Sequence, residues 1–226
     1  MTAWQLACID MAGTTVRDDG LVEQAFTVAF AGEGVAPGTQ QHERMLAVVR
    51  KTMGQSRIEV FRLLLDGDER RAQAANDTFE EAYGLLVDEG AVLPIPGAIE
   101  AIKALRANGI KVALTTGFAR ATQEAIIDAL GWWGQVDLVL SPADAGRGRP
   151  FPDFMLVSAL KLGVEDVRRM LVVGDTPLDL IAGQRAGAGL LVGVLTGAGD
   201  RQALRAAGAH EVIGSIGSLP RLLGLE

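Results

Sequence analysis

The sequence predicts an α/β protein: a doubly wound, Rossmann-like parallel sheet with an all-helical cap domain inserted after the first strand. From residue 97 onward, short apolar runs alternate with helical patterns, which is typical of parallel strands joined by right-handed crossovers. One further apolar run, at Leu6 to Asp10, is separated from these by roughly 80 residues of purely helical periodicity. That distance is too long for an ordinary connection between a strand and a helix, so we interpret it as an insertion.

Composition narrows the function classes. The chain has 226 residues, 49% of them hydrophobic, which is enough for one large core or a core with a smaller lobe. Its 28 acidic and 21 basic residues give a net charge of −7, and no basic cluster occurs, so we expect a small-molecule ligand and no nucleic acid. We expect no zinc site or Ser-His-Asp triad, because neither of the two histidines has metal-ligand spacing.

Cysteine content and hydropathy predict the compartment. The single cysteine, Cys8, excludes an internal disulfide framework and suits a reducing environment, and we expect it to be a buried, inert thiol. No apolar run of about 18 residues is present, and the N-terminus lacks a basic segment followed by a long apolar one. We therefore expect a cytoplasmic protein without a membrane partner.

The first strand ends in an aspartate and a glycine turn, in the stretch LACIDMAGTT from Leu6 to Thr15. A short apolar run closed by turn residues is typical of a buried parallel strand. Open α/β sheets bind ligands just beyond the carboxyl ends of their strands, where Asp10 would lie. An aspartate at such a place can also serve only as a turn former or helix cap.

Four amphipathic stripes follow, and a bundle of four helices accounts for them. They lie near residues 22–30, 45–49, 58–65 and 79–87. The connector Pro94-Ile95-Pro96-Gly97 cannot continue a helix and ends this region. We assign residues 16–96 to a helical cap domain and residues 1–15 and 97–226 to the catalytic core. Because the insertion starts beside Asp10, we interpret it as a lid rather than a decorative insertion.

The remaining chain supplies the rest of the sheet. We expect helices at 98–107, 121–130, 154–162, 180–186 and 202–207, and strands at 110–115, 136–140, 170–173, 190–195 and 211–213.

Polar side chains follow four of the predicted strands. They are Asp10, Thr116-Gly117, Arg149 in the long loop GRGRPFP, and Asp175 with Asp179 in GDTPLD. Carboxylates from two strand ends can share a hard cation such as Mg²⁺. A threonine hydroxyl and a guanidinium suit phosphate-type oxygens. An aspartate nucleophile beside them would permit phosphoryl transfer through an aspartyl phosphate.

These motifs, DMAGTT, TTGFAR, GRPFP and VVGDTPLD, occur in the order seen in the haloacid dehalogenase superfamily, and the chain resembles its phosphonoacetaldehyde hydrolase (phosphonatase) branch over nearly its whole length. The resemblance implies that Mg²⁺ is held by Asp10, the Ala12 carbonyl and Asp175, with Asp179 in support. It further implies a phosphoryl site formed by Ala12, Gly13, Thr116, Gly117 and Arg149, with Asp10, Thr116 and Arg149 catalytic.

Three positions depart from the family pattern: Ala12, a variation typical of phosphonatases, Arg149 in place of the usual lysine of the third motif, and Arg57. A second aspartate usually stands two residues after the nucleophile, where it protonates the leaving group and activates water, a contribution of about 10²- to 10⁴-fold. Ala12 can do neither. The cap motif Met53-Gly54 is normally followed by a lysine that forms an imine with the substrate aldehyde, but Arg57 occupies that position. A guanidinium stays protonated and cannot act as the amine of an imine.

Three interpretations remain open. We favour phosphoryl-aspartate chemistry on another small phosphonate or phosphate ester, with Met53, Gly54 and Arg57 selecting the substrate and Arg57 binding an anionic group such as a carboxylate. A true phosphonoacetaldehyde hydrolase would need Lys51 or Lys103 as the imine former. If the helix continued, the six positions between Lys51 and Arg57 would place them on different faces. The third interpretation is a catalytically weak phosphate-binding regulatory protein. An apolar cap helix could also pair with its twin in a homodimer.

Overall fold

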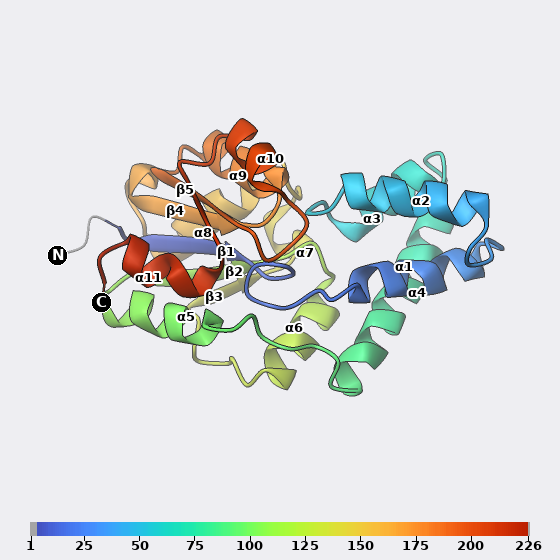
Figure 1. Ribbon diagram of the computed structural model, residues 1–226, viewed down its shortest axis with the longest axis horizontal. Coiled ribbons are helices and arrows are strands. Elements are labelled where there is room, and N and C mark those ends of the chain that lie inside the picture. The colour runs from blue at the N-terminus through green and yellow to red at the C-terminus, as the bar shows by residue number, and fades with distance from the viewer. Residues whose placement is uncertain (1–3, 226) are drawn as a thin grey trace.

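The computed structural model describes residues 4–225 and contains one six-stranded parallel sheet (Figure 1). Its strand order is β3-β2-β1-β4-β5-β6. The bounds are β1 Leu6–Asp10, β2 Lys111–Thr115, β3 Leu138–Leu140, β4 Met170–Gly174, β5 Leu190–Val194 and β6 Glu211–Ile213. All five neighbouring pairs are parallel, so the predicted doubly wound sheet is confirmed.

The first strand is central, and this explains its wholly apolar run before Asp10. Strand β1 lies between β2 and β4, and each of its five residues is buried. The register pairs Asp10 with Thr115 and Ile9 with Val173, so the ends of these three strands meet at one edge of the sheet. The carboxyl edge beside β1 is where the strand order reverses, which is the usual ligand site of an open α/β sheet.

Helices cover both faces of the sheet. One face packs against α8 Asp153–Leu162, α9 Pro177–Ala186 and α10 Arg201–Ala206. The other packs against α5 Ala98–Ala107, α6 Arg120–Ala129 and α11 Leu219–Leu222. Every helix expected in the core forms, with ends shifted by a few residues. Two short helices were not expected, α7 Pro142–Ala145 and α11, because a single turn leaves little periodicity in a sequence.

Strand β3 is two residues shorter than expected. The expected strand began at Val136, whereas β3 begins at Leu138. The Asp137 carboxylate accepts the backbone N–H of Val112 at 2.8 Å and also pairs with Arg106. This side chain takes a hydrogen bond that a strand backbone would otherwise accept.

The insertion consists of four helices that lie together at one end of the molecule (Figure 1). They are α1 Leu21–Gly32, α2 Gln40–Lys51, α3 Arg57–Leu64 and α4 Glu69–Asp88. Phe26 is fully buried among Phe30, Phe61 and Phe79, with ring centroids 4.7–5.8 Å away. This aromatic centre gives the insertion a core of its own, and from it we propose that residues 16–96 form a separate cap domain.

Candidate active site

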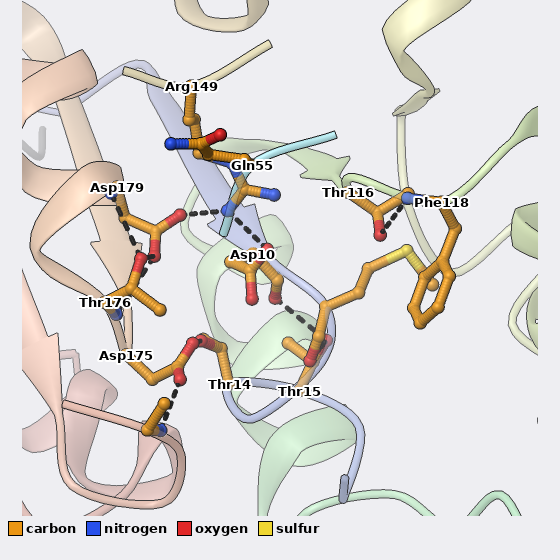
Figure 2. A network of polar contacts seen from close by, with 12 residues as sticks. Asp10, Thr14, Thr15, Gln55, Thr116, Phe118, Arg149, Asp175, Thr176 and Asp179 are labelled. Atoms are coloured by element: carbon orange, nitrogen blue, oxygen red, sulfur yellow. Dashed lines mark hydrogen bonds and ion pairs between the residues drawn. The ribbon is translucent and has the colours of Figure 1, made fainter. Parts of the chain in front are cut away.

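Three buried aspartates meet at the carboxyl edge of the sheet (Figure 2). Asp10 is the last residue of β1, Asp175 follows β4 directly, and Asp179 lies in the first turn of α9. Each can offer one carboxylate oxygen such that the three oxygens lie within 4.8 Å of one another. The structure therefore brings together three residues that are up to 169 positions apart in the chain.

Arg149 reaches this cluster from the loop after α7. Its Nη1 donates to Asp10 Oδ1 at 2.5 Å and also to an Asp179 oxygen. The guanidinium is buried, and the two carboxylates outweigh the effect of burial and raise its pKa above the ordinary value. Arg149 is therefore a fixed positive charge between Asp10 and Asp179, as Figure 2 shows.

Asp175 is held by donors from two loops. Thr14 Oγ1 donates to Asp175 Oδ1 at 3.1 Å, and the Ala198 N–H donates to Oδ2 at 2.8 Å. A Cβ atom on Gly13 would lie 2.7 Å from Asp175 Oδ2, and one on Gly197 would overlap the same carboxylate. Glycine is needed at both positions because the two loops close tightly around Asp175.

Asp179 has both oxygens engaged. It forms a capping box with Thr176, whose N–H and hydroxyl donate to Asp179 Oδ2 at 3.1 and 2.5 Å. Its other oxygen accepts from Arg149. Asp179 therefore orients Arg149 and the first turn of α9.

The cluster carries more negative than positive charge. Burial raises the pKa of Asp10 to about 6, against the opposing effect of Arg149. Burial, with repulsion from Asp10 and Asp179, raises the pKa of Asp175 well above its ordinary value. A divalent cation would relieve this repulsion, and buried oxygen donors suit Mg²⁺. The acidic cluster thus fits a metal site of the expected kind.

The predicted phosphoryl-binding residues line one cavity of about 450 Å³ with these aspartates. Thr116 and Gly117 follow β2, and the Thr116 hydroxyl accepts the Phe118 N–H at 3.3 Å. Ala12 and Gly13 enter the cavity wall from the turn after β1. The volume suits a phosphoryl group with a small organic part.

The cap loop between α2 and α3 forms part of the wall of this cavity. Met53, Gly54 and Arg57 line it, as expected. A Cβ atom on Gly54 would lie 2.7 Å from Thr176 Oγ1, and the Arg57 N–H donates to the Gly117 carbonyl at 3.3 Å. The loop therefore touches the core on both sides of Asp10, next to Asp175 and next to Thr116.

Arg57 is buried and almost without polar partners. Its side chain stacks on Phe118, with the guanidinium carbon 4.8 Å from the ring centre, and Nη1 donates to the Gln55 carbonyl at 3.1 Å. Its Nε has no hydrogen-bond partner. Burial lowers its pKa, an effect that Glu80 and Asp18 oppose through their charge.

Neither alternative lysine reaches the cavity. Helix α2 ends at Lys51, and a loop separates it from α3, which begins at Arg57. The two residues therefore do not lie on one continuous helix, so the comparison of their helix faces does not apply. Lys51 is exposed, and Lys103 is exposed on α5. Among residues 4–225, no lysine lines this cavity.

Several lining residues escaped the sequence analysis. Asp18 stands in the linker to α1, and Thr196, Gly197 and Ala198 follow β5. Thr196, Gly197 and Ala198 belong to the stretch TGAG, which directly follows an apolar strand. This stretch contains no charged residue that would indicate a functional site.

A parallel sheet with a helical insertion and an aspartate cluster at its carboxyl edge is typical of a class of α/β hydrolases. The chain matches the haloacid dehalogenase-like hydrolase family over residues 4–187, and it belongs to that family. It is a hydrolase of the haloacid dehalogenase superfamily, as the sequence motifs indicated.

Relatives narrow the resemblance further. A phosphonoacetaldehyde hydrolase from Bacteroides fragilis is 32% identical, over 98% of this chain and 97% of its own. One from Bacillus cereus is 30% identical, over 84% and 75% of the two chains. Among solved structures, a phosphonoacetaldehyde hydrolase-like protein from Oleispira antarctica superposes with a TM-score of 0.84 at 28% identity, covering 98% of this chain and 92% of its own.

Within the described part of the chain, no helix has both the length and the apolar character needed to cross a membrane.

Proposed function

We propose that the protein is a Mg²⁺-dependent hydrolase that cleaves a C–P or P–O bond of a small phosphonate or phosphate ester through an aspartyl phosphate on Asp10. The observation that carries this proposal is the position of the Asp10 carboxylate. It lies in the wall of the cavity of about 450 Å³ that Thr116 and Gly117 also line, and it accepts a hydrogen bond from the Arg149 guanidinium. A nucleophile, a fixed cation and an oxyanion-binding turn are the parts that phosphoryl transfer needs.

In this proposal, Asp10 attacks phosphorus, and Arg149, Thr116, Gly117 and Gly13 hold the phosphoryl oxygens. Mg²⁺ bound by Asp10, the Ala12 carbonyl and Asp175 would supply further neutralisation of the phosphoryl charge. Asp179 keeps Arg149 in place.

Arg57 would bind a second anionic group of the substrate, such as a carboxylate, with Met53 and Gly54 shaping the pocket. This role follows from a buried guanidinium in the wall of the phosphoryl cavity. Burial strengthens a guanidinium–anion pair because water no longer competes for it.

The names of the curated relatives favour phosphonoacetaldehyde as a second candidate substrate. An imine route would require a lysine at the cavity, and neither Lys51 nor Lys103 lines it. A regulatory protein without turnover is disfavoured because the nucleophile, the arginine and the acidic cluster are all present.

The test is Asp10→Asn, assayed for Mg²⁺-dependent phosphate release on a panel of phosphonates and phosphate esters. Asparagine keeps the shape of the side chain but cannot attack phosphorus, so turnover should fall by about 10⁴-fold or more. Asp77→Asn is the matched control, since Asp77 lies on the exposed side of α4. Substantial phosphate release by Asp10→Asn would contradict the assignment of the nucleophile.

A further inference from the structure

The proposed function leaves one task in the cavity unassigned. Hydrolysis through an aspartyl phosphate needs an acid that protonates the leaving atom and a base that deprotonates the attacking water, and position 12 offers only a methyl group. Among the described residues that line the cavity, none is a histidine, lysine, tyrosine or cysteine. Its arginines keep their protons, so the search for the missing acid and base narrows to the carboxyl groups of the wall.

The carboxyl groups of the cavity wall differ in what already engages them. Asp10 and Asp175 belong to the aspartate cluster at the sheet edge. Asp19 and Glu23 each form an ion pair with an arginine, at 2.8 and 2.6 Å. Asp18, the remaining one, forms no ion pair with any of residues 4–225. It is therefore the carboxyl group that is free to exchange a proton.

One oxygen of Asp18 fixes the side chain and the other is unengaged. Its Oδ1 accepts the N–H of Val22, in the first turn of α1, at 3.0 Å. Its Oδ2 accepts no hydrogen bond from the part of the chain that the structure describes. A carboxyl group held in this way keeps its orientation and still has one oxygen available for a substrate or a water.

The surroundings of Asp18 suit proton exchange. Burial raises the pKa of its carboxyl group above the ordinary value, and the helix N–H and the positive charge of Arg57 oppose this effect. The neighbouring carboxylates of Glu23 and Asp19 raise the pKa further. Tyr83 of α4 also lies within range of the Asp18 charge, and burial raises the pKa of its hydroxyl, which stays neutral. A raised pKa brings a carboxyl group closer to neutral pH, where it can both donate and accept a proton.

The linker between β1 and α1, which carries Asp18, is held against the core (Figure 1). The Gly13 N–H donates to the Val16 carbonyl at 2.7 Å, so the linker begins in contact with the turn that lines the cavity. The Arg17 N–H donates to the carbonyl of Leu93, in the returning linker, at 2.8 Å. Asp18 follows directly, and its position is therefore set by the core on one side and by α1 on the other.

Building on the proposed function, we propose that Asp18 is the general acid and base of the reaction. Its carboxyl group protonates the leaving atom, and its carboxylate then deprotonates the water that hydrolyses the aspartyl phosphate. Asp18 lines the same cavity as Asp10 and Ala12, and this cavity suits a phosphoryl group with a small organic part. From there it acts on the reacting atoms directly or through one water. A further carboxylate at position 12 would add to this activity.

The two steps balance in atoms and electrons. A carboxylate oxygen of Asp10 attacks phosphorus, the bond from phosphorus to the leaving atom breaks, and the leaving atom keeps the electron pair and takes the proton of Asp18. Water then gives a proton to the Asp18 carboxylate and attacks the same phosphorus. The bond from phosphorus to the Asp10 oxygen breaks, which restores the Asp10 carboxylate and the protonated Asp18. The net reaction consumes one water and yields the protonated leaving group and inorganic phosphate.

A series of leaving groups tests the acid. Asp18→Asn removes the proton but keeps a side chain that can accept the helix N–H. For phosphoglycolate and phenyl phosphate, whose leaving oxygens need a proton, we expect kcat/KM to fall by about 10²- to 10⁴-fold. For p-nitrophenyl phosphate, whose leaving group departs as an anion, kcat/KM should stay within about threefold of the wild type.

A burst experiment tests the base. With p-nitrophenyl phosphate, Asp18→Asn should release one p-nitrophenolate per protein rapidly and then turn over slowly, because the aspartyl phosphate forms but water is not activated. Mass spectrometry of the acid-quenched variant should find the phosphoryl group on Asp10. The wild type should show no such accumulation. This experiment needs only p-nitrophenyl phosphate, so it decides the question even if the other two probes bind poorly.

Asp68→Asn is the matched control for the loss of a helix-capping carboxylate. Asp68 caps α4 by accepting the Arg71 N–H at 3.0 Å, as Asp18 accepts an N–H of α1, but it is exposed and does not line the cavity. Its kinetics should match those of the wild type for every probe. If Asp18→Asn does not fold, Asp18→Ser, which can also accept a helix N–H, replaces it in both experiments.

The outcomes separate this proposal from the proposed function. Wild-type turnover that Asp18→Asn reproduces for every probe would overturn the role of Asp18 and leave the proposed function standing. An equal loss for all leaving groups, without a burst, would do the same, since it would show only a structural role. No phosphate and no aspartyl phosphate from the wild type with any probe, acetyl phosphate included, would refute both.

Discussion

Gly117 of the core and Gln55 of the cap lie so close that a Cβ atom on residue 117 would overlap the carbonyl oxygen of Gln55. The contact is beside Thr116, on the turn after β2, and the cap loop continues from it to Arg57. The position of the loop between α2 and α3 and the shape of the turn after β2 are therefore coupled, because residue 117 has no side chain.

Gly117→Ala should hold the cap loop away from the sheet edge. The fold should survive, because the backbone there does not have a positive φ. We expect kcat/KM to fall by about 10²-fold, since a displacement of about 1 Å in a reacting group has that effect. Steady-state kinetics measure the loss. Gly84→Ala in α4, where an added Cβ meets no other atom, is the control and should leave the kinetics unchanged.

Mg²⁺ should stabilise the folded protein, because it would offset the repulsion between Asp10, Asp175 and Asp179. At about 100 times its dissociation constant a ligand adds about 2.7 kcal/mol, which corresponds to a Tm increase of about 5–10 °C for a chain of this size. Thermal unfolding with Mg²⁺ and with EDTA measures the shift.

Asp175→Asn should abolish the Mg²⁺ effect. Without metal this variant should melt no lower than the wild type, because one of three repelling charges is gone. A Tm that rises with Mg²⁺ as much in Asp175→Asn as in the wild type would place the cation elsewhere.

Ala12→Asp restores a carboxylate two positions after the nucleophile. Residue 12 lines the cavity with Asp10, so the new side chain should reach the leaving group. We expect hydrolysis of ordinary phosphate monoesters to rise by about 10²-fold. Phosphate release from phosphoglycolate measures the change, and Asp10→Asn/Ala12→Asp is the blank. An unchanged rate would show that position 12 does not face the leaving group.

Cys8 should be unreactive in the folded protein. Burial raises the pKa of its thiol to about 12 from a usual value of 9.0, so the thiol is protonated at neutral pH. The pKa of this thiol is higher in the folded protein than in the unfolded chain. The protonated thiol therefore contributes its full stability to the fold below pH 9, and this contribution is lost as the pH rises from 9 to about 12. A thiol reagent at pH 8 should label the protein only after guanidinium unfolding. Rapid labelling of native protein would contradict the burial of this strand.

Much of the fold could be predicted because its signals are local. Strands β1 and β4 are buried on both faces, so they are continuous apolar runs that any reading of the sequence detects. The four cap helices carry apolar stripes at helical spacing because one side of each helix is buried. The sequence did not predict helices α7 and α11, because a helix of a single turn has no detectable period. It also placed the start of β3 two residues too early, because the Asp137 side chain accepts a backbone hydrogen bond there.

The candidate site divides in a similar way. Asp10, Thr116, Arg149 and Asp175 could be named from the sequence because each follows a strand in a motif of its own. Thr14 and Ala198 could not, since a hydroxyl and a backbone N–H that hold Asp175 carry no distinguishing pattern.

By itself, the sequence determined the succession of strands and helices along the chain and the polar side chains available at the strand ends. It also showed that the expected aspartate at position 12 and the expected lysine at position 57 are absent. These follow from residue type and spacing, which are properties of the chain alone. The tertiary structure decided that Asp179 has both oxygens engaged, that Lys51 and Lys103 lie outside the cavity, and that the buried Arg57 guanidinium stacks on Phe118 within reach of the charges of Glu80 and Asp18. Those facts depend on which distant segments pack together, and burial turns an ordinary surface charge into one that requires an anion.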